Sequence, residues 1–143
     1  MSYTARSCGR TDMNAVKERP SMEEWFREAC ETDQDGRTGI YLFYNGIVKH
    51  RHCDHSDRAE GFRNIRSFSQ RYDRFKAEAA VVDTYRMQGI THVRIWINDG
   101  VLTPGDRTML VMVGGDSQEN AGNGLSYLTR ILETECISSE ESM

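Results

Sequence analysis

The chain has 143 residues, of which 38% are hydrophobic and 28% charged, a size and composition typical of one soluble globular domain. No apolar run approaches the roughly 20 residues of a membrane-spanning helix, so we expect no membrane segment. The net charge of −4 argues against a general nucleic-acid-binding protein, because such proteins are usually basic. Arginines nevertheless gather between Arg51 and Arg86 and predict a local basic face that attracts anions.

Cysteine usage and the first residues indicate the compartment. The cysteines stand far apart and form no C-x-x-C pair, which argues against a disulfide framework. They are Cys8, Cys30, Cys53 and Cys136. Arg6, Arg10 and Lys17 are not followed by an apolar core, so we expect no secretory signal. The pattern therefore predicts a cytoplasmic protein with reduced thiols.

The first predicted elements are a tail and a helix. Residues 1–19 are polar and lack periodicity, which predicts a flexible tail. Ser21 and Glu24 fit a capping box at the start of a short amphipathic helix that ends in the turn-forming residues 32–36. The apolar positions of this helix are Met22, Trp25, Phe26, Ala29 and Cys30.

Strands and a second helix follow. Residues 39–49 are the strongest strand candidate, and Gly46 within them predicts a bulge or a close backbone approach. A long polar loop is expected from His50 to Gly61, then a weak strand over 62–68. The next helix stops at Gly89 and has an apolar stripe at three- and four-residue steps. The stripe consists of Tyr72, Phe75, Ala79, Val82 and Tyr85.

Residues 91–98 alternate as a strand with two distinct faces. Val93, Ile95 and Ile97 form one face, and His92, Arg94, Trp96 and Asn98 form the other. Turns are expected at 98–100 and 103–106, and another strand at 108–113.

Asp116 and Glu119 are expected to cap a last helix, in which Gly122 and Gly124 weaken the first turns. Its apolar stripe is Ala121, Leu125, Leu128 and Leu132. Residues 138–143 are expected to fray. The order α-β-β-α-β-β-α with short connections predicts a single α/β (α+β) domain over residues 20–137, with a mainly antiparallel sheet packed against three helices.

One segment is dense in metal-binding side chains. Three of the four histidines and one cysteine fall within six residues, at His50, His52, Cys53 and His55. Imidazole and thiolate are good ligands for zinc. The spacing matches no standard zinc motif, so a solvated polar loop is the competing interpretation. Asp73, Glu78 and Asp83 on the middle helix are better explained as its solvated face than as catalytic carboxylates.

Two glycine motifs carry a family resemblance. They are Gly39-x-x-x-x-Tyr44-x-Gly46-x-Val48-Lys49 and Gly100-x-Leu102-x-Pro104-Gly105-Asp106. Together with the element order, they make residues 21–137 similar to the large, catalytic subunit of molybdopterin synthase. The resemblance implies the α/β hammerhead fold of that family.

The resemblance also implies partners and a reaction. Large subunits of this family form homodimers and bind a small ubiquitin-like sulfur carrier that ends in a Gly-Gly thiocarboxylate. Sulfur then passes to an anionic pterin, cyclic pyranopterin monophosphate. In this chain, the resemblance places Tyr44, Lys49 and Arg51 in the substrate-binding region.

Most of the family's cationic positions hold other residues here. The two His-Arg pairs of the family become Ile97-Asn98 and Ser117-Gln118, and its two lysines fall near Glu133 and near Ser139-Glu140. Three functions therefore compete: a sulfur-transfer subunit whose charge comes from Lys49, Arg51, Arg107 or Arg130; a non-catalytic dimeric relative; and a metal-sensing domain built on His50–His55. The missing cations favour the second over the first, within molybdenum cofactor biosynthesis.

Overall fold

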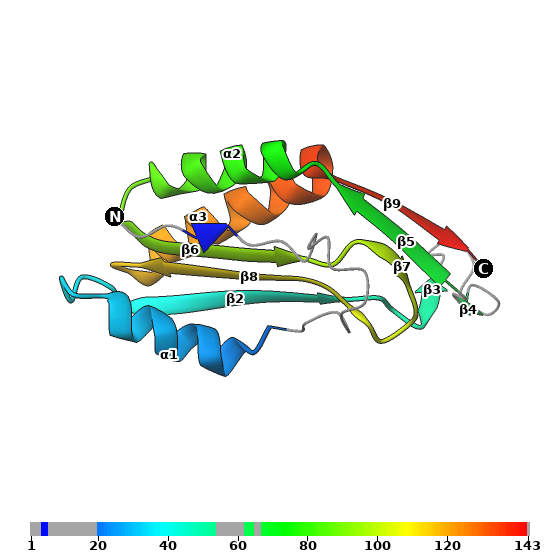
Figure 1. The fold of residues 1–143 in the computed structure, drawn as a ribbon, viewed down its shortest axis with the longest axis horizontal. Coiled ribbons are helices and arrows are strands. Elements are labelled where there is room, and N and C mark those ends of the chain that lie inside the picture. The colour runs from blue at the N-terminus through cyan, green and yellow to red at the C-terminus, as the bar shows by residue number, and fades with distance from the viewer. Residues whose placement is uncertain (1–3, 6–19, 54–61, 65–66, 143) are drawn as a thin grey trace.

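The computed structural model describes residues 4–5, 20–53, 62–64 and 67–142. Its main sheet contains β1 (Thr4–Ala5), β2 (Ile40–Ile47), β6 (Ile90–Ile97) and β8 (Arg107–Gly115). The strand order is β1-β6-β8-β2, and only the short β1–β6 pair is parallel. β8 thus has an antiparallel partner on each side (Figure 1). The predicted, mainly antiparallel α+β fold is confirmed.

A smaller antiparallel sheet stands at one end of the main sheet (Figure 1). It contains β5 (Ser67–Tyr72), β7 (Gly100–Leu102) and β9 (Ile137–Ser142), in the order β7-β5-β9. Gln70 on β5 joins the two sheets. Its buried side-chain amide donates to the main-chain carbonyls of Asn98 at 2.7 Å and Thr108 at 2.9 Å. The remaining two strands, β3 (Arg51–Cys53) and β4 (Phe62–Asn64), pair with each other.

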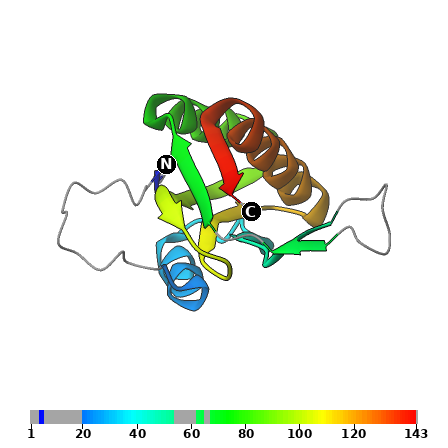
Figure 2. The same cartoon turned by 90° about the vertical axis from the view of Figure 1, so that its right-hand side faces the viewer.

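Helices cover both faces of the main sheet (Figure 2). They are α1 (Met22–Thr32), α2 (Arg74–Tyr85) and α3 (Gln118–Ile131). α3 continues into a single π-helical turn, η1 (Leu132–Cys136), which leads directly into β9. None of the described helices is long and apolar enough to cross a membrane.

The alternation predicted for residues 91–98 is confirmed and separates two cores. Val93, Ile95 and Ile97 pack in the core on the α2 and α3 side, with Leu128 and Leu132. On the opposite face, Trp96 packs with Trp25 and Ala29 of α1, and with Leu110 and Met112 of β8. Every residue from 109 to 115 is buried, because β8 is covered on both faces.

Two arginines fasten α1 to the sheet. Arg94 Nη1 donates to Glu28 Oε2 at 2.6 Å, and its guanidinium lies 4.5 Å from the centre of the Trp25 ring. Arg107 Nη2 donates to the carbonyl oxygen of Pro20 at 2.6 Å and lies 5.7 Å from the Trp96 ring. At the start of α1, the Ser21 half of the predicted capping box is present, since Ser21 Oγ accepts from the Glu24 amide at 3.2 Å.

The face predicted for the middle helix is wrong. α2 begins after Asp73, whose carboxylate accepts from the amides of residues 75 and 76, and Phe75 is 83% exposed. The buried residues of α2 are Ala77, Ala80, Val81 and Thr84. Small side chains let this helix approach β6 and α3 closely, so the alanines determine its orientation more than the aromatic residues do.

The last helix also differs from its prediction. Ser117, rather than Asp116, is the N-cap, and its Oγ accepts from the Asn120 amide at 3.2 Å. Gly124 is buried, and a Cβ there would lie 2.5 Å from Ile90 Cδ1. Its role is therefore close packing, which offsets the low helix propensity of glycine.

Three further boundaries are corrected. Residues 138–142, expected to fray, belong to β9 and pair along β5, a partner far away in the sequence. The loop expected from residue 50 contains β3, and the weak strand over 62–68 is divided between β4 and β5. The expected tail lies outside the described residues except for β1, and the bulge predicted at Gly46 is confirmed by a register shift between Gly46 and Ile47.

We expect Gly114→Ala to destabilise the fold. An added Cβ would lie 2.8 Å from Tyr41 Cε1 and 3.0 Å from His92 Cβ, and such overpacking costs about 1–3 kcal/mol. Gly122→Ala is the matched control, because a Cβ there meets nothing within 4 Å and alanine gains about 0.5–1 kcal/mol of helix stability. Urea denaturation measures both, and a destabilisation of equal size in the two variants would contradict this account.

Candidate functional site

The end of β2 carries the residues that the sequence placed near a substrate. Tyr41 and Phe43 pack on the α1 side of the sheet. Because strand side chains alternate, Tyr44 points to the opposite side, where α3 packs on β2 and β8. Beyond β2, the Val48 amide donates to Asp106 O and its carbonyl accepts from the Gly105 amide, both at 2.8 Å.

These bonds anchor the segment that continues to Lys49 and His50. The predicted turn over 103–106 is stabilised by hydrogen bonds within it: Asp106 Oδ2 accepts from Thr103 N at 2.9 Å and from Thr103 Oγ1 at 3.0 Å. Gly105 has φ +92, a conformation that glycine adopts readily, and its Cα faces the His50 ring. Lys49 and His50 are both exposed beside this turn.

Tyr44 makes the central contact of the site. Its hydroxyl donates to Glu133 Oε1 of η1 at 2.5 Å, between residues far apart in the sequence. The hydrogen bond to Glu133, followed by burial and by the negative charge of Glu133, raises the pKa of Tyr44 from its ordinary 10.0 to about 12. The structure thus joins the two positions where the family resemblance places an aromatic residue and a lysine, and fills the second with a carboxylate.

The other positions expected to hold cations have structural roles or face solvent. Asn98 is 6% exposed, and its Nδ2 donates to Arg107 O at 2.9 Å. Ser117 caps α3, whereas Gln118 is exposed. Ser139 and Glu140 are exposed on β9. Within the described part of the chain, none of these positions presents a positive charge to an anionic substrate.

The arginines proposed as substitutes are largely engaged elsewhere. Arg107 fastens α1, as described above, and Arg130 stacks 5.8 Å from the ring of Tyr127, its neighbour on α3. The backbone of Arg51 belongs to β3, but its side chain lies outside what the structure describes. Among the predicted cations whose side chains are described, Lys49 and Arg130 are therefore the exposed ones.

The predicted metal site is described only in part. His50 is exposed, the side chains of His52 and Cys53 are not described, and His55 lies outside the described residues. Among the side chains that are described, no three His, Cys, Asp or Glu residues are close enough to hold a metal ion. The zinc site stays a prediction.

Sequence reasoning missed a hollow on the other side of η1. It has a volume of about 570 Å³ and lies where β5 enters α2 and η1 enters β9. Its lining consists of Arg71, Tyr72, Asp73, Thr134, Glu135, Cys136, Ile137 and Ser138. The second half of this set was assigned to a helix end and a frayed terminus, so no local pattern could have revealed that the two segments meet.

Sheets and helices in this arrangement form the fold of molybdopterin synthase large subunits, as comparison with solved structures shows. The chain is similar to the molybdopterin biosynthesis MoaE protein from Burkholderia ambifaria, with a TM-score of 0.66 and 15% identity over 100% of this chain and 84% of that one. For the molybdopterin cofactor biosynthesis protein E from Burkholderia multivorans, the TM-score is 0.70 at 14% identity, over 100% and 85% of the two chains.

A third likeness is to a protein solved in complex. The complex of subunits 1 and 2 of molybdopterin-converting factor from Helicobacter pylori gives a TM-score of 0.60 and 14% identity, over 85% of this chain and 78% of that one. No family model and no curated protein sequence matches the chain. The predicted fold is therefore confirmed, at a sequence identity of only 14–15%.

We expect Glu133→Gln to lower the pKa of Tyr44 from about 12 toward 10.0, because the hydrogen bond to Glu133 is the main cause of its rise. Since the folded-state pKa is raised, the stabilisation by this bond is fully present below about pH 10 and is lost as the pH rises through 12. Tyrosinate absorbance during alkaline titration, with Tyr44→Phe as the blank, measures the shift. Glu135→Gln is the control, and an unchanged titration in Glu133→Gln would contradict the assignment.

For the metal site, we expect zinc to co-purify at about one equivalent per chain. His52→Ala combined with Cys53→Ser should abolish it, because the remaining histidines supply too few ligands. Elemental analysis after purification without chelator or affinity tag measures the content. Metal-free wild-type protein would return His50–His55 to the interpretation of a solvated loop.

Proposed function

We propose that this chain is a binding protein of molybdenum cofactor biosynthesis, related to the molybdopterin synthase large subunit but with a degenerate sulfur-transfer site. The fold supports the pathway, because the solved structures that share it over most of their length are those of molybdopterin biosynthesis proteins. The observation that carries the proposal is the hydrogen bond from Tyr44 to Glu133, because the family resemblance calls for a lysine near the position of this carboxylate.

Electrostatics explains why this change weakens catalysis. Sulfur transfer to a pterin phosphate needs positive groups that hold the anion and stabilise charge as the acyl group moves. Glu133 repels the phosphate, and the Tyr44 hydroxyl is already occupied as a donor. Lys49 supplies a single point charge, without the paired donors of an arginine.

A degenerate catalytic site does not prevent the chain from binding a protein partner. The structure of molybdopterin-converting factor from Helicobacter pylori contains both of its subunits, which supports a small sulfur-carrier partner for this chain. We also propose that the chain acts in the cytoplasm as a homodimer. β2 supports this, because it ends the main sheet and carries Tyr44 and Ile47 at 37% and 58% exposure, and an exposed edge strand favours pairing with another chain.

An assay with a thiocarboxylated small subunit and cyclic pyranopterin monophosphate tests the proposal. We expect turnover about 100-fold or more below that of an ordinary large subunit, because one missing charged contact in such a site costs about that factor. Glu133→Lys should raise turnover, whereas Glu31→Lys, on the opposite side of the sheet, should not.

Size-exclusion chromatography with light scattering separates the parts of the proposal. We expect a dimer mass and a complex with the small subunit even without turnover. A monomer would contradict the dimer, and failure to bind the small subunit would contradict the binding role. Wild-type turnover equal to that of an ordinary large subunit would overturn the degenerate site.

A further inference from the structure

The hollow beside η1 lies where two connections of the chain meet. β5 passes into α2 and η1 passes into β9 side by side, and the Asp73 amide donates to Cys136 O at 2.8 Å between them. The π-helical turn closes with a bond from the Ile137 amide to Leu132 O. Such turns are rare and often accompany functional sites. At about 570 Å³, the hollow falls within the size range of small-molecule sites.

Two opposite charges line this hollow without neutralising each other. Arg71 is exposed on β5 and Glu135 is exposed on η1. Among the described residues, neither side chain takes part in an ion pair or a hydrogen bond. The third charged residue, Asp73, caps α2: its Oδ1 accepts from Phe75 N at 3.0 Å and from Lys76 N at 3.1 Å, and its carboxylate keeps its charge. Arg71 and Glu135, on separate elements, thus line the hollow as a cation and an anion without a partner among the described residues, beside the capping carboxylate of Asp73.

The inner wall of the hollow is apolar. Cys136 is 4% exposed, and burial raises the pKa of its thiol, so the thiol stays neutral. Tyr72 and Ile137 pack partly buried against the same core as Cys136. The hydroxyl of Thr134 donates to Arg130 O at 2.8 Å, which leaves its oxygen as an acceptor. The site therefore combines one cation, the carboxylates of Glu135 and Asp73, and an apolar wall.

We propose that this hollow binds a small zwitterion of the α-amino-acid type. The carboxylate of the ligand binds the Arg71 guanidinium, which matches its planar geometry, and the ammonium binds Glu135. The apolar side chain of the ligand packs against Tyr72, Cys136 and Ile137. This site goes beyond the proposed function, because neither Tyr44 nor Glu133 lines it.

The test is a titration of the full chain, labelled with ¹⁵N and followed by NMR, with leucine as the probe. Leucine should shift the amide signals of residues 71–73 and 134–138 and leave the rest of the spectrum unchanged. Arg71→Gln and Glu135→Gln should each weaken binding about tenfold, because each removes a charge-assisted hydrogen bond. Glycine, which lacks a side chain for the apolar wall, should bind more weakly than leucine.

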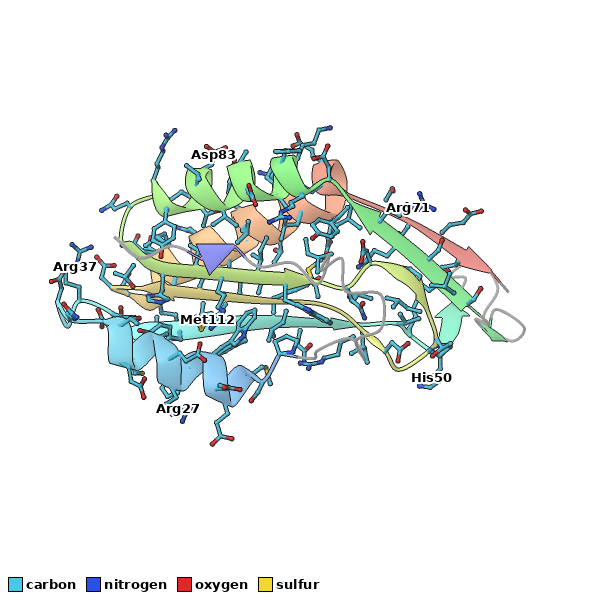
Figure 3. All side chains as sticks on the ribbon, in the orientation of Figure 1. Arg27, Arg37, His50, Arg71, Asp83 and Met112 are labelled. Carbon is cyan, nitrogen blue, oxygen red and sulfur yellow. The ribbon has the colours of Figure 1, made fainter. Side chains whose placement is uncertain are left out.

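Matched controls are Arg37→Gln and Glu119→Gln, which remove exposed charges outside the hollow. Figure 3 shows Arg37 at one end of the molecule and Arg71 far from it, on β5. Both controls should keep wild-type affinity, and the unshifted signals of every variant report that it is folded. The proposal is overturned if acetate or methylammonium shifts the same signals as strongly as leucine does. It is also overturned if either charge can be removed without effect, or if leucine causes no shift at roughly 50 mM.

Discussion

Burial of β8 on both faces is the constraint on which the rest of the structure depends. Residues 109–115 contact helices above and below, so the strand needs an apolar side chain, or a glycine, at every position. One face requires α2 and α3, and the other requires α1 with its tryptophan. Because α1 covers its side of the sheet with few large residues, two arginines of the sheet help to hold it in position. Arg94 binds Glu28, and Arg107 binds the carbonyl of Pro20.

Local sequence patterns predicted the elements that depend mainly on residues close together in the sequence. The alternation of 91–98, the Ser21 cap, the bulge at Gly46 and the turn at 103–106 are set by neighbours in sequence, and all four are present. β9 could not be predicted in this way, because its polar residues form a strand through hydrogen bonds to β5. The orientation of α2 failed for a related reason: close packing on α3 and β6 favours Ala77 and Ala80 over larger residues.

In the candidate site, too, the sequence predicted the residues of a local motif but not the contacts between distant segments. Tyr44 and Lys49 were identified by a motif within one strand, but the contact of Tyr44 with Glu133 depends on how α3 crosses the sheet. The hollow beside η1 joins residues from two strands and a π-helical turn, and a π-helical turn has no clear sequence signal. Its charges, Arg71 and Glu135, look like ordinary solvated residues when each is considered in its own segment.

Gln70 gives the molecule a mechanical property. Its one amide group satisfies carbonyls on both sides of the junction between β6 and β8 while its backbone belongs to the smaller sheet. Any tilt of the smaller sheet away from the main one would break both hydrogen bonds of the buried Gln70 amide. The two bonds therefore oppose a hinge between the sheets, and they carry part of any force applied to the smaller sheet to the strands that hold the core.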